Sequence, residues 1–367
     1  MCDKLFNHIF SGIYCFRFQP GELFSCCFSQ EGFMQNKSRM MWIYAALIVL
    51  FLGIRPLVSA QDGGRAVVDE AGRKVLIPAR VDRLIATVPW MLSITSAING
   101  RDKIVGLTLE ATKDYGFNTL FPDWIKQTPV VGSFNELNLE TTMKTNPQMI
   151  LSQPGKVVEQ MQTVNVPVAV VTREKEIPEN IRFIGAVIGR EQEAEELASF
   201  YLRKMDLVKS RIASQPDRAP KKVYFIAGPN PLQTIGRDFG NEPLIRAAGG
   251  RLATEAVKGS TGITVSAEQL LQWNPDIIVV GFGWGLKPAD ILNNPKWQGL
   301  TAVKDTAVFL EPPPHAACLK KHPSSCLGAL WLAQKIAPDL FKDVDIRQEA
   351  ENFIKKFYGV TWKADFI

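Results

Sequence analysis

The sequence lacks several features that would assign it to common functional classes. Its 367 residues contain no run of five or six like charges, and the formal net charge is only +5, so composition does not indicate a nucleic-acid-binding protein. No H-E-x-x-H, G-x-S-x-G or glycine-rich phosphate-binding motif occurs where a strand would turn into a helix. Histidine is scarce, with three residues in the whole chain. These absences make an enzyme the weaker hypothesis.

Long hydrophobic segments are also absent, apart from one near the N-terminus. Residues 41–57 are mostly apolar, but Arg55 and Pro56 interrupt them. The uninterrupted part is shorter than the roughly 20 residues that a membrane-spanning helix needs. A secretory signal peptide is therefore favoured over a membrane anchor.

The residues around this apolar segment match the pattern of an export signal. Lys37 and Arg39 precede it, and small residues ending at Ala60 follow at the positions that a signal peptidase reads. We predict a leader and signal peptide over residues 1–60, cleaved near Ala60, in which residues 1–33 are interpreted as an upstream mis-start. No cysteine follows the segment for lipid attachment, so the expected location is the periplasm, an oxidising space.

From residue 67 onward, short apolar runs alternate with segments of helical periodicity. Helices are predicted at residues 139–145 and 157–163. Strands are predicted at residues 84–88, 104–107, 149–151, 168–171, 223–226, 277–280 and 307–309. Buried strands that alternate with helices are typical of parallel sheets covered on both faces. The predicted fold class is therefore α/β, with two doubly wound lobes of mainly parallel sheet.

The two groups of strands are separated by residues 178–216, which contain no proline between their first and last positions. Acidic residues gather early in this segment and basic residues late, which suits a helix macrodipole, and apolar residues recur at helical spacing. About 25 helical residues would span roughly 37 Å. We predict an N-terminal lobe over residues 61–177, this linking helix region, and a C-terminal lobe over residues 217–367.

A short internal repeat supports two equivalent lobes. Glu140 precedes an Asn-Pro pair at residues 146–147 by six positions, and Glu268 precedes the pair at residues 274–275 by the same spacing. A buried strand follows each pair, and a capping-box pattern begins at Ser266. Chance recurrence of a helix, Asn-Pro and a strand is the alternative interpretation.

Several segments together resemble one family. They are residues 131–134, 138–140, 241–250, 265–276, 327–333 and 357–359. The chain over these segments resembles the periplasmic binding proteins of ABC importers for cobalamin, haem and ferric siderophores, which have two lobes joined by a rigid helix. None of the segments would be specific alone, and they do not identify the ligand.

The resemblance implies a transport function. It implies a monomer that captures a metal chelate in the cleft between two lobes that move little, needs no cofactor, and hands the chelate to a dimeric ABC permease. Family members dock through one exposed glutamate per lobe, and Glu140 and Glu268 occupy those positions of the motif. Such charges set register and association rate more than affinity. The alternative is that both acids only favour a helix N-terminus.

Aromatic residues in loops that follow strands are candidates for the ligand-binding cleft. Ligands of such folds lie beyond the carboxyl ends of the strands. Trp90, Phe134, Phe282 and Trp284 are placed in such loops by the predicted strands. Aromatic walls suit a bulky organic chelate. Packing within each lobe is the alternative role.

A cluster of histidine and cysteine is the least expected feature, and the family resemblance does not require it. His315, Cys318, His322 and Cys326 are the only residues of these two types after residue 60. Three interpretations remain open: a Cys318–Cys326 disulfide, coordination of a metal or of a chelate's metal centre by His315 or His322, and a four-residue zinc site.

Two other classes of function remain as alternatives to transport. An exported metal-dependent enzyme could use the same histidine and cysteine cluster, although no general base is evident beside it. A ligand-sensing protein could use the same cleft to signal to a membrane receptor.

Overall fold

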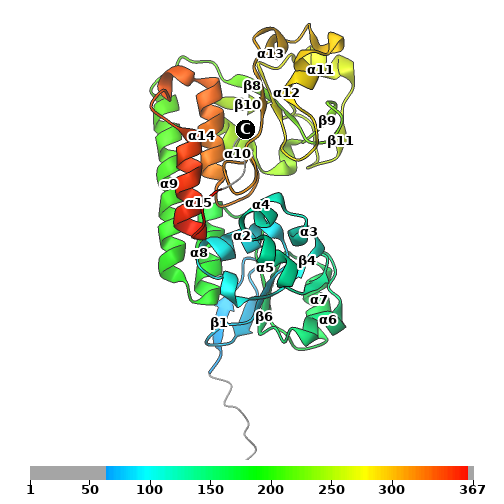
Figure 1. Ribbon diagram of the computed structural model, residues 1–367, viewed down its shortest axis with the longest axis vertical. Helices are drawn as coiled ribbons and strands as arrows, with labels where there is room; N and C mark the ends of the chain where they lie inside the picture. The colour runs from blue at the N-terminus through cyan, green and yellow to red at the C-terminus, as the bar shows by residue number, and fades with distance from the viewer. Residues whose placement is uncertain (1–62, 363–367) are drawn as a thin grey trace, which may run out of the picture. The chain divides into compact units, whose positions relative to one another are not determined.

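The computed structural model describes residues 63–362 (Figure 1). The predicted leader and its cleavage position near Ala60 lie outside the described residues. Within residues 63–362, no helix has both the length and the apolar character needed to cross a membrane.

The N-terminal half of this region contains a five-stranded parallel sheet in the order β5-β4-β3-β6-β7. Its strands are β3 (Leu84–Ala86), β4 (Ile104–Thr108), β5 (Val130–Gly132), β6 (Met149–Ser152) and β7 (Val168–Val170). Its helices are α2 (Pro89–Ala97), α3 (Leu109–Thr112), α4 (Tyr115–Leu120), α5 (Pro122–Gln127), α6 (Leu139–Lys144) and α7 (Lys156–Gln162). An antiparallel hairpin, β1 (Arg65–Val68) and β2 (Lys74–Ile77), precedes this sheet.

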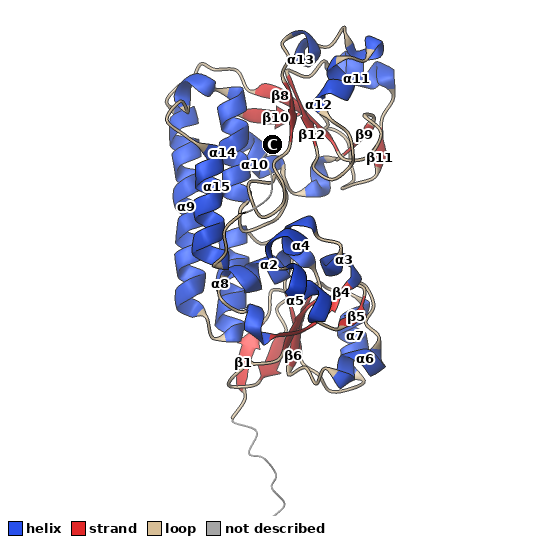
Figure 2. Ribbon diagram, viewed as in Figure 1, coloured by secondary structure: helices blue, strands red, loops and turns tan. Residues whose placement is uncertain are grey.

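The C-terminal half contains a second sheet, in which β10, β8, β12 and β13 are parallel and β9 and β11 form an antiparallel edge. Its strands are β8 (Lys221–Ile226), β9 (Gln233–Thr234), β10 (Gly250–Leu252), β11 (Ile263–Thr264), β12 (Ile277–Val280) and β13 (Val308–Leu310). Its helices are α10 (Glu242–Ala247), α11 (Ala267–Trp273), α12 (Pro288–Leu292), α13 (Thr301–Lys304), α14 (Ser325–Ile336) and α15 (Ile346–Tyr358). Figure 2 shows the two sheets separately, with helices around each.

The predicted linking helix region contains two helices in the structure. They are α8 (Ile177–Ile188) and α9 (Glu191–Ala213). Gly189 lies between them with φ of 69°, a left-handed conformation that ends a helix and that glycine adopts without strain. The predicted linking helix of about 25 residues corresponds to α9, which has 23 residues and runs beside both sheets (Figure 1), and α8 precedes it in the same region.

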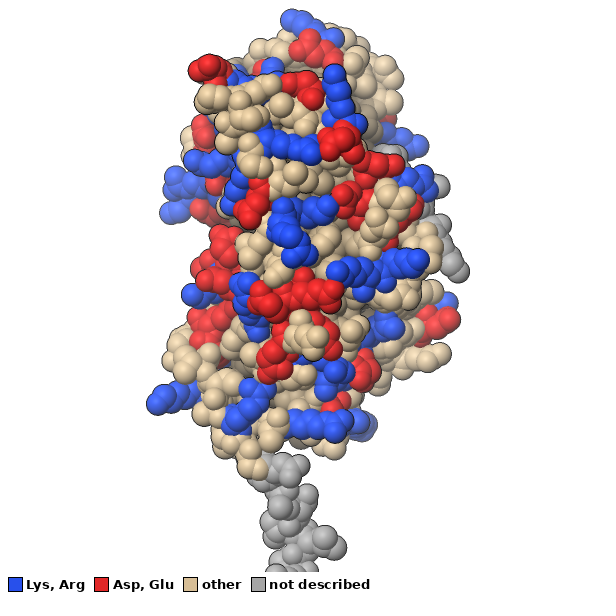
Figure 3. All heavy atoms as spheres, turned by 90° about the vertical axis from the view of Figure 1, so that its left-hand side faces the viewer, with Lys and Arg blue, Asp and Glu red and all other residues tan. Residues whose placement is uncertain are grey.

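Helices α9, α14 and α15 pack together and connect the halves of the described chain. The ring of Phe200 on α9 lies 5.4 Å from that of Phe357 on α15, and Lys204 pairs with Glu349 at 2.7 Å. Buried apolar residues from both halves form one continuous core through these helices. Lys and Arg alternate with Asp and Glu over the outer face of this helical layer, so it carries no extended surface of one charge (Figure 3).

All seven predicted strands are present. The seven predicted segments correspond to β3, β4, β6, β7, β8, β12 and β13. All seven contain buried or half-buried residues and pair in parallel with a neighbouring strand. Continuous hydrophobic runs are typical of strands in a sheet that is covered on both faces. The predicted α/β fold class is confirmed, whereas the lobe boundaries remain a prediction.

Candidate functional site

A cavity of about 610 Å³ lies between the carboxyl ends of the two sheets. Trp90 and Ser93, which follow β3, and Arg173, which follows β7, line it from the first sheet. The second sheet contributes residues 227–229, which follow β8, Trp284, which follows β12, and part of the segment after β13. Parallel sheets bind ligands at this edge, so the cavity is the candidate site. A smaller hollow of about 360 Å³ adjoins it and shares Arg173, Phe239 and Lys321.

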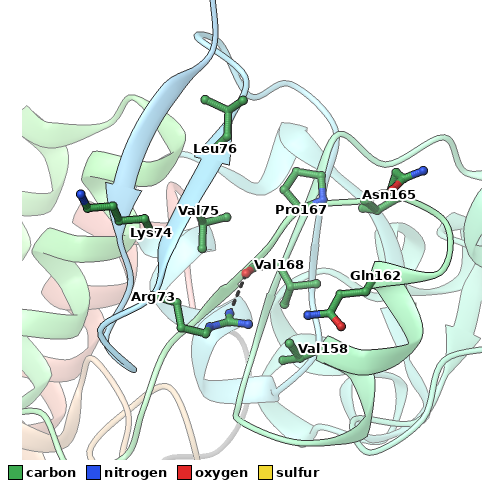
Figure 4. A pocket seen from close by; sticks show the side chains of 10 residues that line it. Arg73, Lys74, Val75, Leu76, Val158, Gln162, Asn165, Pro167 and Val168 are labelled. Atoms are coloured by element: carbon green, nitrogen blue, oxygen red, sulfur yellow. Dashed lines mark hydrogen bonds between the residues drawn. The ribbon is translucent and has the colours of Figure 1, made fainter.

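A further hollow lies away from the sheet edge at which parallel sheets bind ligands. It measures about 470 Å³ and lies between strand β2 and the region of α7 and β7 (Figure 4). Pro167 and Val168 place it at the amino end of β7, away from the carboxyl edge of the sheet. Arg73 in its wall already has partners within the protein: its guanidinium donates to the carbonyl of Val168 at 2.9 Å and forms an ion pair with Asp69. We therefore assign it no role in ligand binding.

The segment after β13 is held by a buried carboxylate. Glu311 is fully buried and accepts hydrogen bonds from the backbone N–H groups of Phe282 at 3.1 Å and Leu319 at 2.8 Å. The ammonium group of Lys320 lies 3.7 Å from the same carboxylate. Burial of a charge is tolerated only with such partners, so Glu311 fixes where residues 312–324 lie relative to β12.

His315 projects from this segment into the first half of the protein. It is fully buried and has φ of 71°. Its ring packs against Phe117, with the ring centres 4.6 Å apart, and lies where a side chain at position 116 would otherwise be. A Cβ atom on Gly116 would lie 1.7 Å from the His315 Nδ1 atom, so only glycine fits there. His315 does not line the cavity, and the structure places it in the packing between the two halves.

The surroundings of His315 are polar on one side and charged on the other. The Ser93 hydroxyl lies 2.9 Å from the Pro89 carbonyl and 3.1 Å from His315 Nε2. The Nδ1 atom finds no hydrogen-bond partner within residues 63–362 and lies 3.7 Å from the Asp114 carboxylate. Burial lowers the pKa of His315, with Asp114 opposing the shift, so the ring is neutral near pH 7.

His322 lies beside His315 and does line the cavity. The two ring centres are 4.4 Å apart. The His322 Nδ1 atom accepts a hydrogen bond from the Ser324 backbone N–H at 3.1 Å, with the Ser324 hydroxyl at 2.8 Å. The Nε2 atom is buried and finds no partner in the described region. Burial lowers the pKa of His322 well below its ordinary value, and the neighbouring His315 and Lys320 lower it further.

The charged groups of the cavity are mainly basic. Arg173, Lys320 and Lys321 line it, against one carboxylate, Asp114. Lys321 donates to the carbonyls of Arg173 at 2.9 Å and Lys175 at 2.6 Å, and burial lowers its pKa to about 8. Desolvation by the cleft walls also lowers the pKa of Arg173, which forms no ion pair in residues 63–362. An unpaired guanidinium at a cleft wall favours an anionic ligand.

The predicted aromatic residues divide into two groups. Trp90 and Trp284 line the cavity from opposite sheets, at 4% and 44% exposure. Phe282 does not line it, and its ring packs edge-on against Tyr115 of the first half at 4.7 Å. Phe134 does not line it either, and its backbone N–H donates to Glu110 at 3.0 Å. The latter two residues thus have packing roles in the structure.

The cysteine predictions are not supported by the structure. Cys318 and Cys326 are both buried free thiols, so the structure does not contain the disulfide that was one of the three open interpretations. Burial raises the pKa of Cys318 to about 12 and raises that of Cys326 as well, so neither is a thiolate. Among residues 63–362, no three His, Cys, Asp or Glu side chains come together as a metal site, so the four-residue zinc site is wrong.

The two predicted docking glutamates are exposed and equivalently placed. Glu140 lies in the first turn of α6 and Glu268 in the first turn of α11. Glu140 pairs with Lys144 at 2.7 Å, and hydrogen bonds from its own backbone N–H and from Ser266 lower the pKa of Glu268. Helices α6 and α11 lie at opposite ends of the described region (Figure 1). Both side chains are exposed at the surface.

Sequence reasoning missed Arg173, Lys321 and Asp114. Arg173 follows β7 closely, so the rule that selected Trp90 would also have selected it. Asp114 could have been recognised only as the N-cap of α4, where it accepts from the Phe117 N–H at 3.0 Å. No local sequence pattern marked Lys321 as a residue of the ligand-binding site.

Two sheet-and-helix halves with a cavity at their facing carboxyl edges define a two-lobed solute-binding protein. Comparison with known families agrees, because the periplasmic binding protein family matches residues 88–314. The chain belongs to the periplasmic binding protein family. It is thus a substrate-binding component of an ABC transporter and not an enzyme, and proteins of this family bind their transported ligand without a cofactor.

Individual relatives are distant. The chain is 27% identical over 331 residues to the molybdate-binding protein MolA of Haemophilus influenzae, covering 82% of this chain and 93% of that protein. It is 24% identical to the iron-uptake system-binding protein of Bacillus subtilis, covering 61% of this chain and 75% of that protein. A solved periplasmic solute-binding protein from Veillonella parvula has a TM-score of 0.70 at 26% identity, covering 82% and 94% of the two chains.

The structure of MolA bound to molybdate has the same fold. Its TM-score is 0.73 at 24% identity, and the match covers 82% of this chain and all of that one.

Proposed function

We propose that this protein captures a small metal-containing anion in the cavity between its two sheets and delivers it to an ABC permease. The observation that carries the proposal is the charge of the cavity, where Arg173 and Lys321 lie with one lining carboxylate, Asp114, while Lys320 is paired with Glu311. An unpaired Arg173 favours an anion because the ligand supplies the missing counter-charge.

Metal oxyanions are the first candidates within this class. The relative MolA is named for molybdate, and the tetrahedral oxyanion fits a cavity of about 610 Å³ together with bridging water. Anionic ferric chelates are the second candidates, because another relative is named for iron uptake and Trp90 and Trp284 offer aromatic walls. The proposed ligands therefore differ from the sequence-based prediction of a ferric siderophore, haem or cobalamin: metal oxyanions are added, and among the chelates the anionic ones are favoured.

Delivery would use the two exposed glutamates. Glu140 and Glu268, at opposite ends of the described region, would contact the permease as charges that set orientation and association rate. Cleavage near Ala60 and export to the periplasm as a monomer belong to the same proposal.

Ligand binding by the purified protein tests the proposal. Melting temperature and calorimetric titration would be compared for molybdate, tungstate, a ferric catecholate complex, haemin and cobalamin, with sulfate as the non-metal control. Binding of at least one metal-containing anion is expected, and Arg173→Ala should weaken it about 10-fold or more, because a charge-assisted contact is lost. If none of the anions raises the melting temperature or releases heat, the proposal fails.

A further inference from the structure

We propose that Lys321 is a positioning residue of the ligand site: its ammonium group holds the loop of residues 172–175 and thereby sets where Arg173 stands at the cavity wall. This inference rests on the proposed function, which it deepens by assigning the contact with the anion to Arg173 and a supporting role to Lys321.

The Lys321 side chain connects the two halves of the protein. It belongs to the segment after β13, and it donates to the carbonyls of Arg173 at 2.9 Å and Lys175 at 2.6 Å, with a longer contact of 3.4 Å to the carbonyl of Thr172. A lysine ammonium has three N–H groups and accepts no hydrogen bond, so these contacts use all of its donors. The ligand therefore finds no free donor on Lys321, although both Lys321 and Arg173 line the cavity.

The loop depends on these contacts because it has few others. Residues 173–175 lie between β7 and α8 and are exposed. Within residues 63–362, Lys321 is the only partner that forms a hydrogen bond to the backbone of these three residues. Hydrogen bonds from a charged donor are roughly twice as strong as neutral ones. Without them, the backbone that carries the Arg173 guanidinium would sample several conformations.

The two ends of the loop have a separate anchor in the first half of the protein. The carboxylate of Glu70 accepts from the Thr172 backbone N–H at 2.6 Å and from the side-chain amide of Asn180, on α8, at 2.7 Å. Glu70 thus holds the residues on either side, and Lys321 holds the middle. Removal of the Lys321 ammonium should therefore release residues 173–175 while β7 and α8 stay folded.

The ammonium of Lys321 is itself fixed in place. It lies 5.1 Å from the ring centre of Trp90, a favourable position for a cation over an aromatic ring. The preceding residue, Lys320, lies 3.7 Å from the buried carboxylate of Glu311, which holds this segment against β12. A binding group is precise only when its support is rigid, and this support comes from the opposite half of the protein.

The first measurement needs no ligand. Trypsin cleaves after Arg173 and Lys175, at the same two carbonyls that accept from Lys321, so the rate of cleavage there reports how often the loop is released. Limited digestion of the full chain, followed by mass spectrometry, compares the unmodified protein with Lys321→Met, Lys321→Arg and Lys335→Met. We expect cleavage at these bonds to be roughly 10-fold faster in Lys321→Met, because hydrogen bonds to a charged group are lost. Lys321→Arg, which keeps a cation with several N–H donors, should stay within about threefold.

Lys335→Met is the matched control. The Lys335 ammonium also lies 5.1 Å from the centre of an aromatic ring, that of Phe309, but it lines neither the cavity nor the adjoining hollow. Its loss should change neither cleavage of the loop nor binding. Thermal unfolding of each variant separates release of the loop from loss of folding, and Lys321→Gln replaces Lys321→Met if the latter does not fold.

The second measurement is a double-mutant cycle on binding. Dissociation constants for molybdate, tungstate and a ferric catecholate complex are determined by calorimetric titration of the unmodified protein, Lys321→Met, Arg173→Ala and the double variant. For whichever probe binds, Lys321→Met alone should raise the dissociation constant roughly 10-fold. In the Arg173→Ala background the same change should raise it less than about threefold, because residues that act through one another are not additive. Lys321→Arg should bind nearly as the unmodified protein does.

Three results would overturn the inference. Equal rates of cleavage in Lys321→Met and the unmodified protein would show that Lys321 does not hold the loop. An equal loss of affinity from Lys321→Met with and without Arg173 would show that Lys321 acts on the ligand directly. In both cases the proposed function stands, because the unmodified protein still binds. If the unmodified protein binds none of the probes, the proposed function fails and the role of Lys321 in binding fails with it.

Discussion

His315 Nε2 and the hydroxyl of Ser93, a residue 222 positions earlier in the chain, share a hydrogen bond of 3.1 Å. The contact joins the segment after β13 to helix α2, so a residue from the second half of the protein completes the packing of the first. Tyr358 of α15 donates to the Ser93 carbonyl at 3.3 Å and reinforces the same junction. These contacts connect the two halves of the protein to each other next to the cavity.

The junction depends on the absence of a side chain at Gly116. Gly116→Ala would bring a methyl group to 1.7 Å from His315 Nδ1, so the His315 ring or helix α4 must move. We expect a loss of about 1–3 kcal/mol in the free energy of unfolding, the usual cost of overpacking a core. Urea unfolding measures it. Gly299→Ala is the control, because the nearest atom to its Cβ lies at 3.9 Å and the change should be close to neutral. Equal stability of the two variants would contradict this account of His315.

Stability should fall on mild acidification because His315 and His322 are buried as neutral rings. Burial lowers the pKa of both below 6.5 in the folded state, whereas in the unfolded state each returns to an ordinary value near 6.5. Below about pH 6.5 the unfolded state binds more protons, so the stability present at higher pH is lost as pH falls through the folded-state pKa values. Each histidine contributes at most about 1.4 kcal/mol per pH unit.

Urea unfolding between pH 5 and 7.5 measures this slope. The groups that face the two rings are Asp114, Tyr358 and Lys320, and none has an ordinary pKa inside that range. His322→Gln should make the free energy of unfolding depend less on pH. His315→Gln should have the same effect on the pH dependence, and it should also lower stability because packing of the ring is lost. A slope that is unchanged in both variants would show that other groups titrate.

The sequence predicted the sheets better than the site. Continuous apolar runs such as residues 277–280 reveal buried parallel strands, because that signal is local. The rule that ligands lie beyond strand ends also found Trp90 and Trp284. It failed for His315, because the space that receives this ring exists only through Gly116, a residue distant in the chain. Long-range complementarity of this kind leaves no pattern in the sequence near either residue.

The linking helix and the cysteines show the same contrast between local and long-range signals. The helix over residues 191–213 was predictable from its order of charges and its apolar spacing, because both signals are local. A spacing of eight positions between Cys318 and Cys326 permits a disulfide, but whether the sulfur atoms face each other is decided by tertiary packing.

The free thiols can be tested directly. We expect Cys318 and Cys326 to resist iodoacetamide in the folded protein, because both are buried and the pKa of Cys318 is raised to about 12. After unfolding in denaturant without a reductant, both should be alkylated, as measured by mass spectrometry of the peptides that contain them. Failure of alkylation until a reductant is added would show that the two cysteines form the disulfide that the sequence left open as one interpretation.

The docking glutamates should affect transport without affecting binding. Glu140→Ala and Glu268→Ala remove exposed carboxylates on helices α6 and α11 that lie away from the cavity, so the dissociation constant for the ligand should not change. Uptake of the ligand by cells that contain the cognate permease should fall, and more so in the double variant, because charges at a docking surface govern orientation and association rate. Glu159→Ala, on the exposed face of α7, is the matched control and should transport normally. The effect should also weaken as salt is raised, since exposed charges are screened over roughly 8–10 Å at physiological ionic strength. Normal uptake by the double variant would show that the permease recognises another surface.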